Sequence, residues 1–291
     1  MQSIPLGHTG EPISAIGYGG MPLSIQGRPS EDDARRAIHA AIDAGMTFID
    51  TADVYCLDDA DLGHNERLIA TTVAERPDRD AIRIATKAGL RRPNGAWTRD
   101  GSPKHIREAC EHSLRVLGPA IGEQIFLYQF HAPDEKVPFE KSIEAFAELQ
   151  REGKCKYVGV SNVGVEQLDR ASAIVDVVSV QNRLNPYFRE SVELAQECGR
   201  RGVTFLAYSP VGGGRLTKKI PKFAVLQEIA KKHDATPHAV TIAWVRAQGK
   251  TVVPIPGGRD PRHIVDSARS AELELTPDEI AAITETEFSR D

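Results

Sequence analysis

The feature that most constrains the fold of this chain is a regular alternation of short apolar runs with longer amphipathic segments. Such alternation predicts parallel β-strands joined by helical crossovers, because parallel neighbours need a long connection. Strands buried on both faces read as continuous apolar runs rather than as a strict alternation of apolar and polar residues. The eight runs span residues 13–20, 47–50, 82–87, 125–131, 156–162, 177–182, 204–209 and 251–257.

The segments between the runs have helical patterns. In "SEDDARRAIHAAIDAG", Ser30 is a predicted N-cap and Gly45 follows the predicted end. Eight strand–helix units within 291 residues favour a (β/α)8 TIM barrel, an α/β fold. The gap 209–251 is too long for one helix and a turn, so "TPHAVTIAWVRAQG" predicts an extra helix. The opening "SIPLGHTGEPIS" predicts an N-terminal hairpin. With no linker or repeat, we expect residues 1–291 to form a single domain.

The composition limits which partners and which cellular compartment we expect for this chain. Its net charge is −5, without the excess of basic residues typical of nucleic-acid-binding proteins, so we do not expect nucleic acid as a partner. No apolar stretch approaches the roughly 20 residues that cross a bilayer, and the first residues lack a signal peptide's basic start and apolar core. The four cysteines lack the spacing of a metal site, so we expect free thiols and no metal. We therefore expect a cytoplasmic protein, monomeric or weakly homo-oligomeric, without a membrane partner.

Polar or aromatic residues stand where most of the runs end. In (β/α)8 barrels the active site lies at the carboxyl ends of the strands, so these residues are expected to meet at one rim. Tyr55 follows five residues after the end of the second run and is expected to return over the same mouth. The run ends are Asp50, Lys87, His131, Ser161-Asn162, Gln181-Asn182, Tyr208-Ser209 and Pro256-Gly257.

The residue types at the second, third and fourth run ends indicate acid–base chemistry. Asp50 and Lys87 on neighbouring strands can form an ion pair. A lysine cation beside the Tyr55 hydroxyl favours the phenolate and is expected to lower the pKa of that phenol. A tyrosine tuned in this way can act as a general acid at neutral pH. His131 can share that proton or orient a substrate oxygen.

Later residues suit a dinucleotide. Ser161, Asn162 and Gln181 can hydrogen-bond a planar carboxamide, and Tyr208 can stack on a ring. The stretch "PIPGGRDPRHIVDSA" offers glycine-rich backbone and then basic side chains at a predicted helix start, which suits a phosphate. A nicotinamide dinucleotide fits both ends of this layout. The basic residues are Arg259, Arg262 and His263.

Four motifs resemble the aldo-keto reductase family: "GMTFIDTADVY" with "NERLI", "IATK", "KYVGVSN" with "SVQNRLNP", and "LAYSPVGGGRL" with "VVPIPGGRDPRHI". They cover most of the chain in the family's order. The resemblance implies an NADPH-dependent oxidoreductase that interconverts an aldehyde or ketone and an alcohol. Hydride would pass from nicotinamide C4, and Tyr55 would give the proton to the oxygen of a small carbonyl substrate. The implied catalytic residues are Asp50, Tyr55, Lys87 and His131. The implied cofactor contacts are Gly20, Met21, Asp50, Ser161, Asn162, Gln181, Tyr208, Ser209, Pro210, Val211, Gly257, Arg259, His263 and Ser267.

The sequence departs from the family pattern at three places. Cys56 stands where the family usually has glycine after the catalytic tyrosine. Ser267 stands where an asparagine usually contacts adenine. The segment after "GGGRL" is short, which implies a reduced clamp over the cofactor and faster cofactor exchange.

Alternative interpretations remain open. A Schiff-base aldolase on the same barrel would use Lys87 as its nucleophile. Some relatives bind NADPH and serve as regulatory subunits with little turnover. Asp50 and Lys87 can also be a purely structural pair. The aromatic residues Tyr18, Trp97, Tyr128 and Trp244 are expected to be packing groups, although Trp97 lies in a loop that could wall a substrate pocket.

Overall fold

A computed structural model describes residues 1–290 of the chain. Eight parallel strands form one sheet in the order β12-β11-β10-β9-β8-β5-β4-β3. The amides of Gly17 and Gly19 donate to the carbonyls of Pro254 (2.9 Å) and Pro256 (3.0 Å), which joins the first strand to the last and closes the barrel. The predicted (β/α)8 fold is confirmed. The strands are β3 (Tyr18–Gly19), β4 (Phe48–Asp50), β5 (Arg83–Ala88), β8 (Ile125–Phe130), β9 (Cys155–Ser161), β10 (Val177–Arg183), β11 (Thr204–Tyr208) and β12 (Val252–Ile255).

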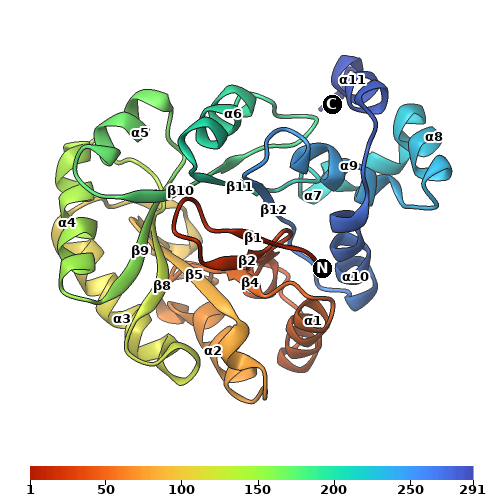
Figure 1. Cartoon of the computed structure of the whole chain (residues 1–291). Helices are drawn as coiled ribbons and strands as arrows, with labels where there is room; N and C mark the ends of the chain where they lie inside the picture. The colour runs from red at the N-terminus through yellow and green to blue at the C-terminus, as the bar shows by residue number, and fades with distance from the viewer. Residues whose placement is uncertain (291) are drawn as a thin grey trace.

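Helices surround the barrel (Figure 1). Helix α1 begins after Ser30, whose hydroxyl accepts the amide of Asp33, as the N-cap prediction requires. The extra helix predicted between the last two strands is α9, and it is buried along most of its length because it packs between α8, α10 and β12. The helices are α1 (Glu31–Asp43), α2 (His64–Ala74), α3 (Pro103–Ile121), α4 (Phe139–Arg151), α5 (Val165–Ser172), α6 (Val192–Arg201), α7 (Gly214–Thr217), α8 (Ala224–Lys232), α9 (Pro237–Arg246), α10 (Pro261–Arg269) and α11 (Pro277–Glu285).

The predicted N-terminal hairpin is formed by β1 (Ser3–Pro5) and β2 (Pro12–Ser14), and it lies across the middle of the barrel in Figure 1. Its residues Leu6 and Ile13 are buried against Phe48 and other side chains of the barrel interior. Because Phe48 begins β4, the hairpin closes the amino end of the barrel and leaves the carboxyl end open for a site.

The prediction of one strand over residues 13–20 is wrong. Its first residues belong to β2, and only Tyr18–Gly19 enters the barrel as β3. The cause is Ser14, whose hydroxyl donates to the carbonyl of Ile16 (2.8 Å) and accepts the amide of Phe48 (3.0 Å). These bonds turn the chain between the two strands.

A second hairpin follows β5 at the carboxyl end of the barrel. It consists of β6 (Leu90–Arg91) and β7 (Thr98–Arg99), joined by the predicted rim loop. This hairpin places residues 92–97 beside the mouth of the barrel. Among the described helices, none is both long and apolar enough to cross a membrane.

Candidate active site

The centre of the candidate site is a buried ion pair between β4 and β5. Asp50 lies beside Ala85 in the parallel register, and Lys87 is two residues further along β5, on the same face. The Lys87 ammonium donates to Asp50 Oδ1 (2.5 Å), to the carbonyl of Thr51 (2.8 Å) and to Tyr55 Oη (3.0 Å). The Lys87 side chain is fully buried and that of Asp50 is 3% exposed. The predicted pair is therefore confirmed, and its lysine contacts the tyrosine hydroxyl directly.

The second carboxylate oxygen of Asp50 accepts hydrogen bonds from two side-chain amides. Gln181 Nε2 lies 2.8 Å and Gln129 Nε2 lies 3.2 Å from Asp50 Oδ2. Gln181 was predicted to bind a cofactor carboxamide, whereas here its amide nitrogen is committed to Asp50 and to Gln129 Oε1 (3.2 Å). Gln129 was missed in the sequence, although a lone glutamine within the apolar run "IFLYQFH" is the signal that could have found it.

Tyr55 reaches the ion pair from the loop after β4. The residue is 7% exposed, and its ring meets His131 (centroids 5.8 Å apart) and Trp97 (6.4 Å apart) edge to face. Burial raises the pKa of the Tyr55 phenol above its usual value, and the nearby Lys87 cation offsets only part of that rise. The expectation of a lowered pKa is therefore wrong. The hydroxyl keeps its proton at neutral pH.

Lys87 is charged in this site, whereas His131 is neutral. Burial disfavours the Lys87 ammonium, but Asp50 and Tyr55 more than compensate, and the pKa of Lys87 is raised. Burial, assisted by the Lys87 cation, holds the pKa of His131 well below its usual value. His131 is thus a neutral imidazole, and within the described chain its buried Nδ1 has no hydrogen-bond partner.

A polar network links the ends of β9, β10 and β11. Asn162 Nδ2 donates to the carbonyl of His131 (2.9 Å), and Asn162 Oδ1 accepts from Tyr208 Oη (2.9 Å). The Ser161 hydroxyl donates to the carbonyl of Gln181 (2.6 Å). Asn162 has a left-handed backbone with φ of 58°. A non-glycine residue in this region is strained, and such strain is concentrated at functional sites.

The segment after β11 is short and braced from the loop after β10. Ser209 also has a left-handed backbone (φ 51°), and its carbonyl accepts Asn185 Nδ2 at 2.8 Å. Tyr187 Oη donates to the carbonyl of Leu216 in α7 (3.1 Å). The remaining predicted contacts here are Pro210, which is buried, and Val211, whose carbonyl accepts Thr217 Oγ1 (3.1 Å).

Gly20 and Met21 follow β3 at the mouth of the barrel. The amide of Gly20 donates to the carbonyl of Asp50 (2.8 Å), and Met21 packs against the cluster that contains Tyr55. A Cβ on Gly20 would lie 2.6 Å from Asn65 Oδ1, so only glycine fits this approach. Met21 therefore lies near Tyr55, and Gly20 lies beside the end of β4; their contact with a cofactor stays a prediction.

Two of the three basic residues near α10, Arg262 and His263, line a common cavity, and Arg259 is not part of its lining. Arg259 Nε donates to the carbonyl of Pro22 (3.0 Å). Arg262 instead pairs with Asp260 through Nε (3.1 Å) and Nη2 (2.6 Å), because Asp260 caps α10 and lies beside it. Gly257 lies beside Pro22, since a Cβ there would be 2.7 Å from the proline ring.

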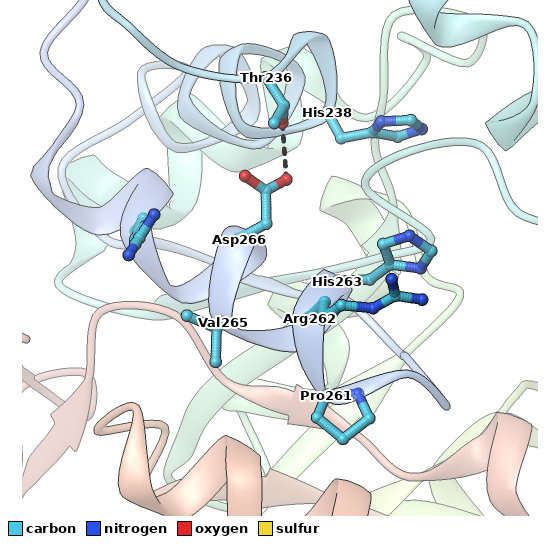
Figure 2. A pocket seen from close by; sticks show the side chains of 8 residues that line it. Thr236, His238, Pro261, Arg262, His263, Val265 and Asp266 are labelled. Carbon is cyan, nitrogen blue, oxygen red and sulfur yellow. Dashed lines mark hydrogen bonds between the residues drawn. The ribbon is translucent and has the colours of Figure 1, made fainter.

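His263 and Arg262 both line a cavity of about 630 Å³ between the starts of α9 and α10 (Figure 2). His238 lines this cavity from α9, and the hydroxyl of Thr236 donates to the Asp266 carboxylate of α10 (2.6 Å). The hydroxyl of Ser267 does not line the cavity, because it donates to the carbonyl of His263 within α10 (2.9 Å).

Cys56, which follows Tyr55, is fully buried. Burial raises the pKa of its thiol to about 11. A thiol with so little thiolate at neutral pH is a poor nucleophile. All four cysteines are free and buried, so the expectation of free thiols is confirmed.

A buried acid behind the site gives a first prediction. Burial raises the pKa of Glu66 from 4.5 to about 7, although Thr86 donates to this carboxyl (2.6 Å). The folded chain therefore holds a proton that the unfolded chain has lost, and stability should fall as pH rises from about 4.5 to 7. Relative to wild type, Glu66→Gln should become more stable by about 3 kcal/mol between pH 5 and pH 8. Urea unfolding at both pH values tests this, and a pH-independent difference would contradict it.

A barrel with a buried polar network at the carboxyl ends of its strands has the arrangement of a barrel enzyme. The sequence profile of the Aldo/keto reductase family matches residues 15–287. The chain is 33% identical to the aldo-keto reductase str7 of Strobilurus tenacellus, over 93% of this chain and 88% of that protein. The chain therefore belongs to the aldo/keto reductase family, and it is an NAD(P)H-dependent oxidoreductase.

Two solved structures extend the comparison. The glycerol dehydrogenase AKR11B4 from Gluconobacter oxydans superposes with a TM-score of 0.82 and 29% identity, over 97% of this chain and 93% of that chain. The aldo-keto reductase AKR11C1 from Bacillus halodurans, solved in its holo form, has a TM-score of 0.79 and 26% identity, over 98% and 96% of the two chains. The barrel fold is therefore shared over nearly the whole length of each.

Proposed function

We propose that this chain reduces an aldehyde or ketone to an alcohol with NADPH, or catalyses the reverse reaction, and that Tyr55 is the proton donor. The contact of Lys87 Nζ with Tyr55 Oη at the barrel mouth carries the proposal. It links a hydroxyl that is protonated at neutral pH to a cation that can stabilise its conjugate base. The relationship to a glycerol dehydrogenase supports alcohol–carbonyl chemistry.

When bound, the nicotinamide supplies a hydride to the carbonyl carbon. Tyr55 gives its hydroxyl proton to the carbonyl oxygen, and the Lys87 ammonium stabilises the phenolate that remains. Asp50 keeps Lys87 charged and oriented. The neutral His131 lies beside the Tyr55 ring and is suited to form a hydrogen bond with the substrate carbonyl oxygen. It is not suited to replace Tyr55 as the proton donor.

The donor groups at the strand ends fit a nicotinamide dinucleotide. The Asn162 amide and the Ser161 hydroxyl are the proposed contacts for the carboxamide, and the Tyr208 ring is the proposed stacking partner of the nicotinamide. Arg259 and His263 are the proposed contacts for the adenosine half. Together with the glycine-rich backbone before α10, they suit an anionic group.

The aldolase alternative is less well supported. A Schiff-base lysine must lose its proton before it attacks a carbonyl. Here all three Lys87 N–H groups are engaged and its pKa is raised.

Oxidation of NADPH, followed by its absorbance across a panel of aldehydes and ketones, tests the reductase. Loss of activity after borohydride treatment with a carbonyl compound would support the aldolase, and NADPH binding without turnover would support a regulatory subunit.

Cofactor choice gives a second prediction. Arg259→Ala should weaken NADPH binding ten- to a hundred-fold and leave NADH binding nearly unchanged, because a charge-assisted bond to the 2′-phosphate contributes roughly 1.5–3 kcal/mol. Arg262→Ala is the matched control, since Arg262 is already paired with Asp260 and should have a smaller effect. Fluorescence titration with both cofactors measures the change. Equal losses for the two cofactors, or a wild-type preference for NADH, would place phosphate recognition elsewhere.

A further inference from the structure

Trp97 is an exposed aromatic side chain beside the proposed proton donor. It is 47% exposed, whereas the other aromatic residues that were expected to be packing groups, Tyr18, Tyr128 and Trp244, are fully buried. Its ring centroid lies 6.4 Å from that of Tyr55, with an angle of 75° between the planes. Trp97 was expected to be a packing group too, and the structure does not place it in the core.

A buried arginine holds Trp97 in this position. Arg92 is 1% exposed, and its guanidinium carbon lies 4.0 Å from the Trp97 ring centroid. Its Nη2 donates to the carbonyls of Cys56 (3.1 Å) and Leu57 (3.2 Å) in the loop that carries Tyr55. No carboxylate among the described residues forms an ion pair with Arg92, so the fold buries a cation that only carbonyls and the indole stabilise. Such burial is costly, and the hydrogen bonds that offset the cost tie Arg92 to the loop that carries Tyr55.

Tyr55 has apolar neighbours besides Trp97. Arg92 covers one face of the indole, so the exposed surface of Trp97 includes the other face. Tyr55 packs in a small cluster with Met21 and Leu90. A flat apolar group at the mouth would find an indole face beside these apolar side chains.

We propose that Trp97, positioned by Arg92, is the platform for an aromatic group attached to the substrate carbonyl, so that the preferred substrates are aromatic aldehydes or ketones. The inference rests on the proposed function, since it requires the carbonyl oxygen to bind at Tyr55 Oη, next to Trp97. The 6.4 Å separation of the two rings is within the range of an aromatic contact.

Steady-state kinetics with benzaldehyde and propanal test the proposal. Wild type should prefer benzaldehyde through a lower KM. Trp97→Ala should raise the KM for benzaldehyde about tenfold, with kcat, the propanal KM and the NADPH Kd within about twofold, because an aromatic contact contributes to binding of the ring alone. Trp97→Phe should restore most of the benzaldehyde KM. Tyr157→Ala is the matched control, because Tyr157 stacks with Lys156 near the start of β9, away from the open mouth. It should leave the benzaldehyde KM unchanged.

A second measurement uses the wild-type protein. The chain has two tryptophans, and Trp244 is fully buried, so acrylamide quenching of fluorescence reports mainly on Trp97. Benzyl alcohol added to the NADP⁺ complex should protect Trp97 from acrylamide, and propanol should not.

Two results would overturn the platform. One is a benzaldehyde KM that is unchanged in Trp97→Ala, or a propanal KM that rises in this variant by the same factor as the benzaldehyde KM. The other is equal protection of Trp97 by both alcohols, or by neither. Either result can occur in an enzyme that still reduces carbonyl compounds. If wild type reduced neither aldehyde nor any other carbonyl compound, the proposed function itself would fail instead.

Discussion

Tyr55→Phe should lower kcat/KM for carbonyl reduction by about 10²-fold or more, the usual scale of general acid catalysis. The substitution removes only the hydroxyl that contacts Lys87 Nζ at 3.0 Å. The phenyl ring keeps its contacts with His131 and Trp97, so the apolar wall of the mouth should persist. The expected loss therefore belongs to the proton transfer and not to a collapsed pocket.

Three measurements separate the chemical step from its alternatives. The Kd for NADPH and the thermal unfolding midpoint should stay close to wild type in Tyr55→Phe. Because the pKa of the wild-type phenol is raised, the rate of reduction in the wild type should not fall through the neutral range from loss of this proton. Near-native turnover in Tyr55→Phe would remove Tyr55 from the mechanism.

The ion pair could be predicted from the sequence because it depends on strand register alone. Asp50 and Lys87 stand at or near the ends of consecutive strands, and parallel neighbours with a two-residue side-chain period bring them together. The closed barrel follows from the same regularity. The division of residues 13–20 between two strands could not be predicted in this way, because a side-chain bond of Ser14 to distant Phe48 decides where the chain turns.

Side-chain partners that come from remote segments could not be predicted from the sequence. Arg259 donates to the carbonyl of Pro22, 237 positions away in the sequence, whereas Arg262 pairs with Asp260 only two positions away. The raised pKa of Tyr55 has a similar origin. The sequence placed a lysine near the phenol, but the burial that outweighs its charge comes from side chains of several loops.

Lys87→Met should lower kcat/KM by about 10²-fold or more and should also destabilise the fold. The variant loses the cation that favours the phenolate of Tyr55, so the pKa of that tyrosine should rise further. It also leaves the Asp50 carboxylate buried, with only the amides of Gln129 and Gln181 to bond it. Breaking one side of a buried pair typically costs 3–5 kcal/mol. Urea unfolding and the pH dependence of kcat/KM measure the two effects.

The double variant Asp50→Asn, Lys87→Met distinguishes tuning from mere structure. Removing both charges leaves no unpaired ion, so much of the stability lost in Lys87→Met should return. Activity should not return, because the phenolate still lacks its cation. The two single losses in kcat/KM should also be far from additive, since Asp50 acts on Tyr55 through Lys87. Recovery of stability and activity together would mean that the pair only supports the barrel. Strictly additive losses in activity would mean that Asp50 and Lys87 act separately, and the tuning of Tyr55 by the pair would then be wrong.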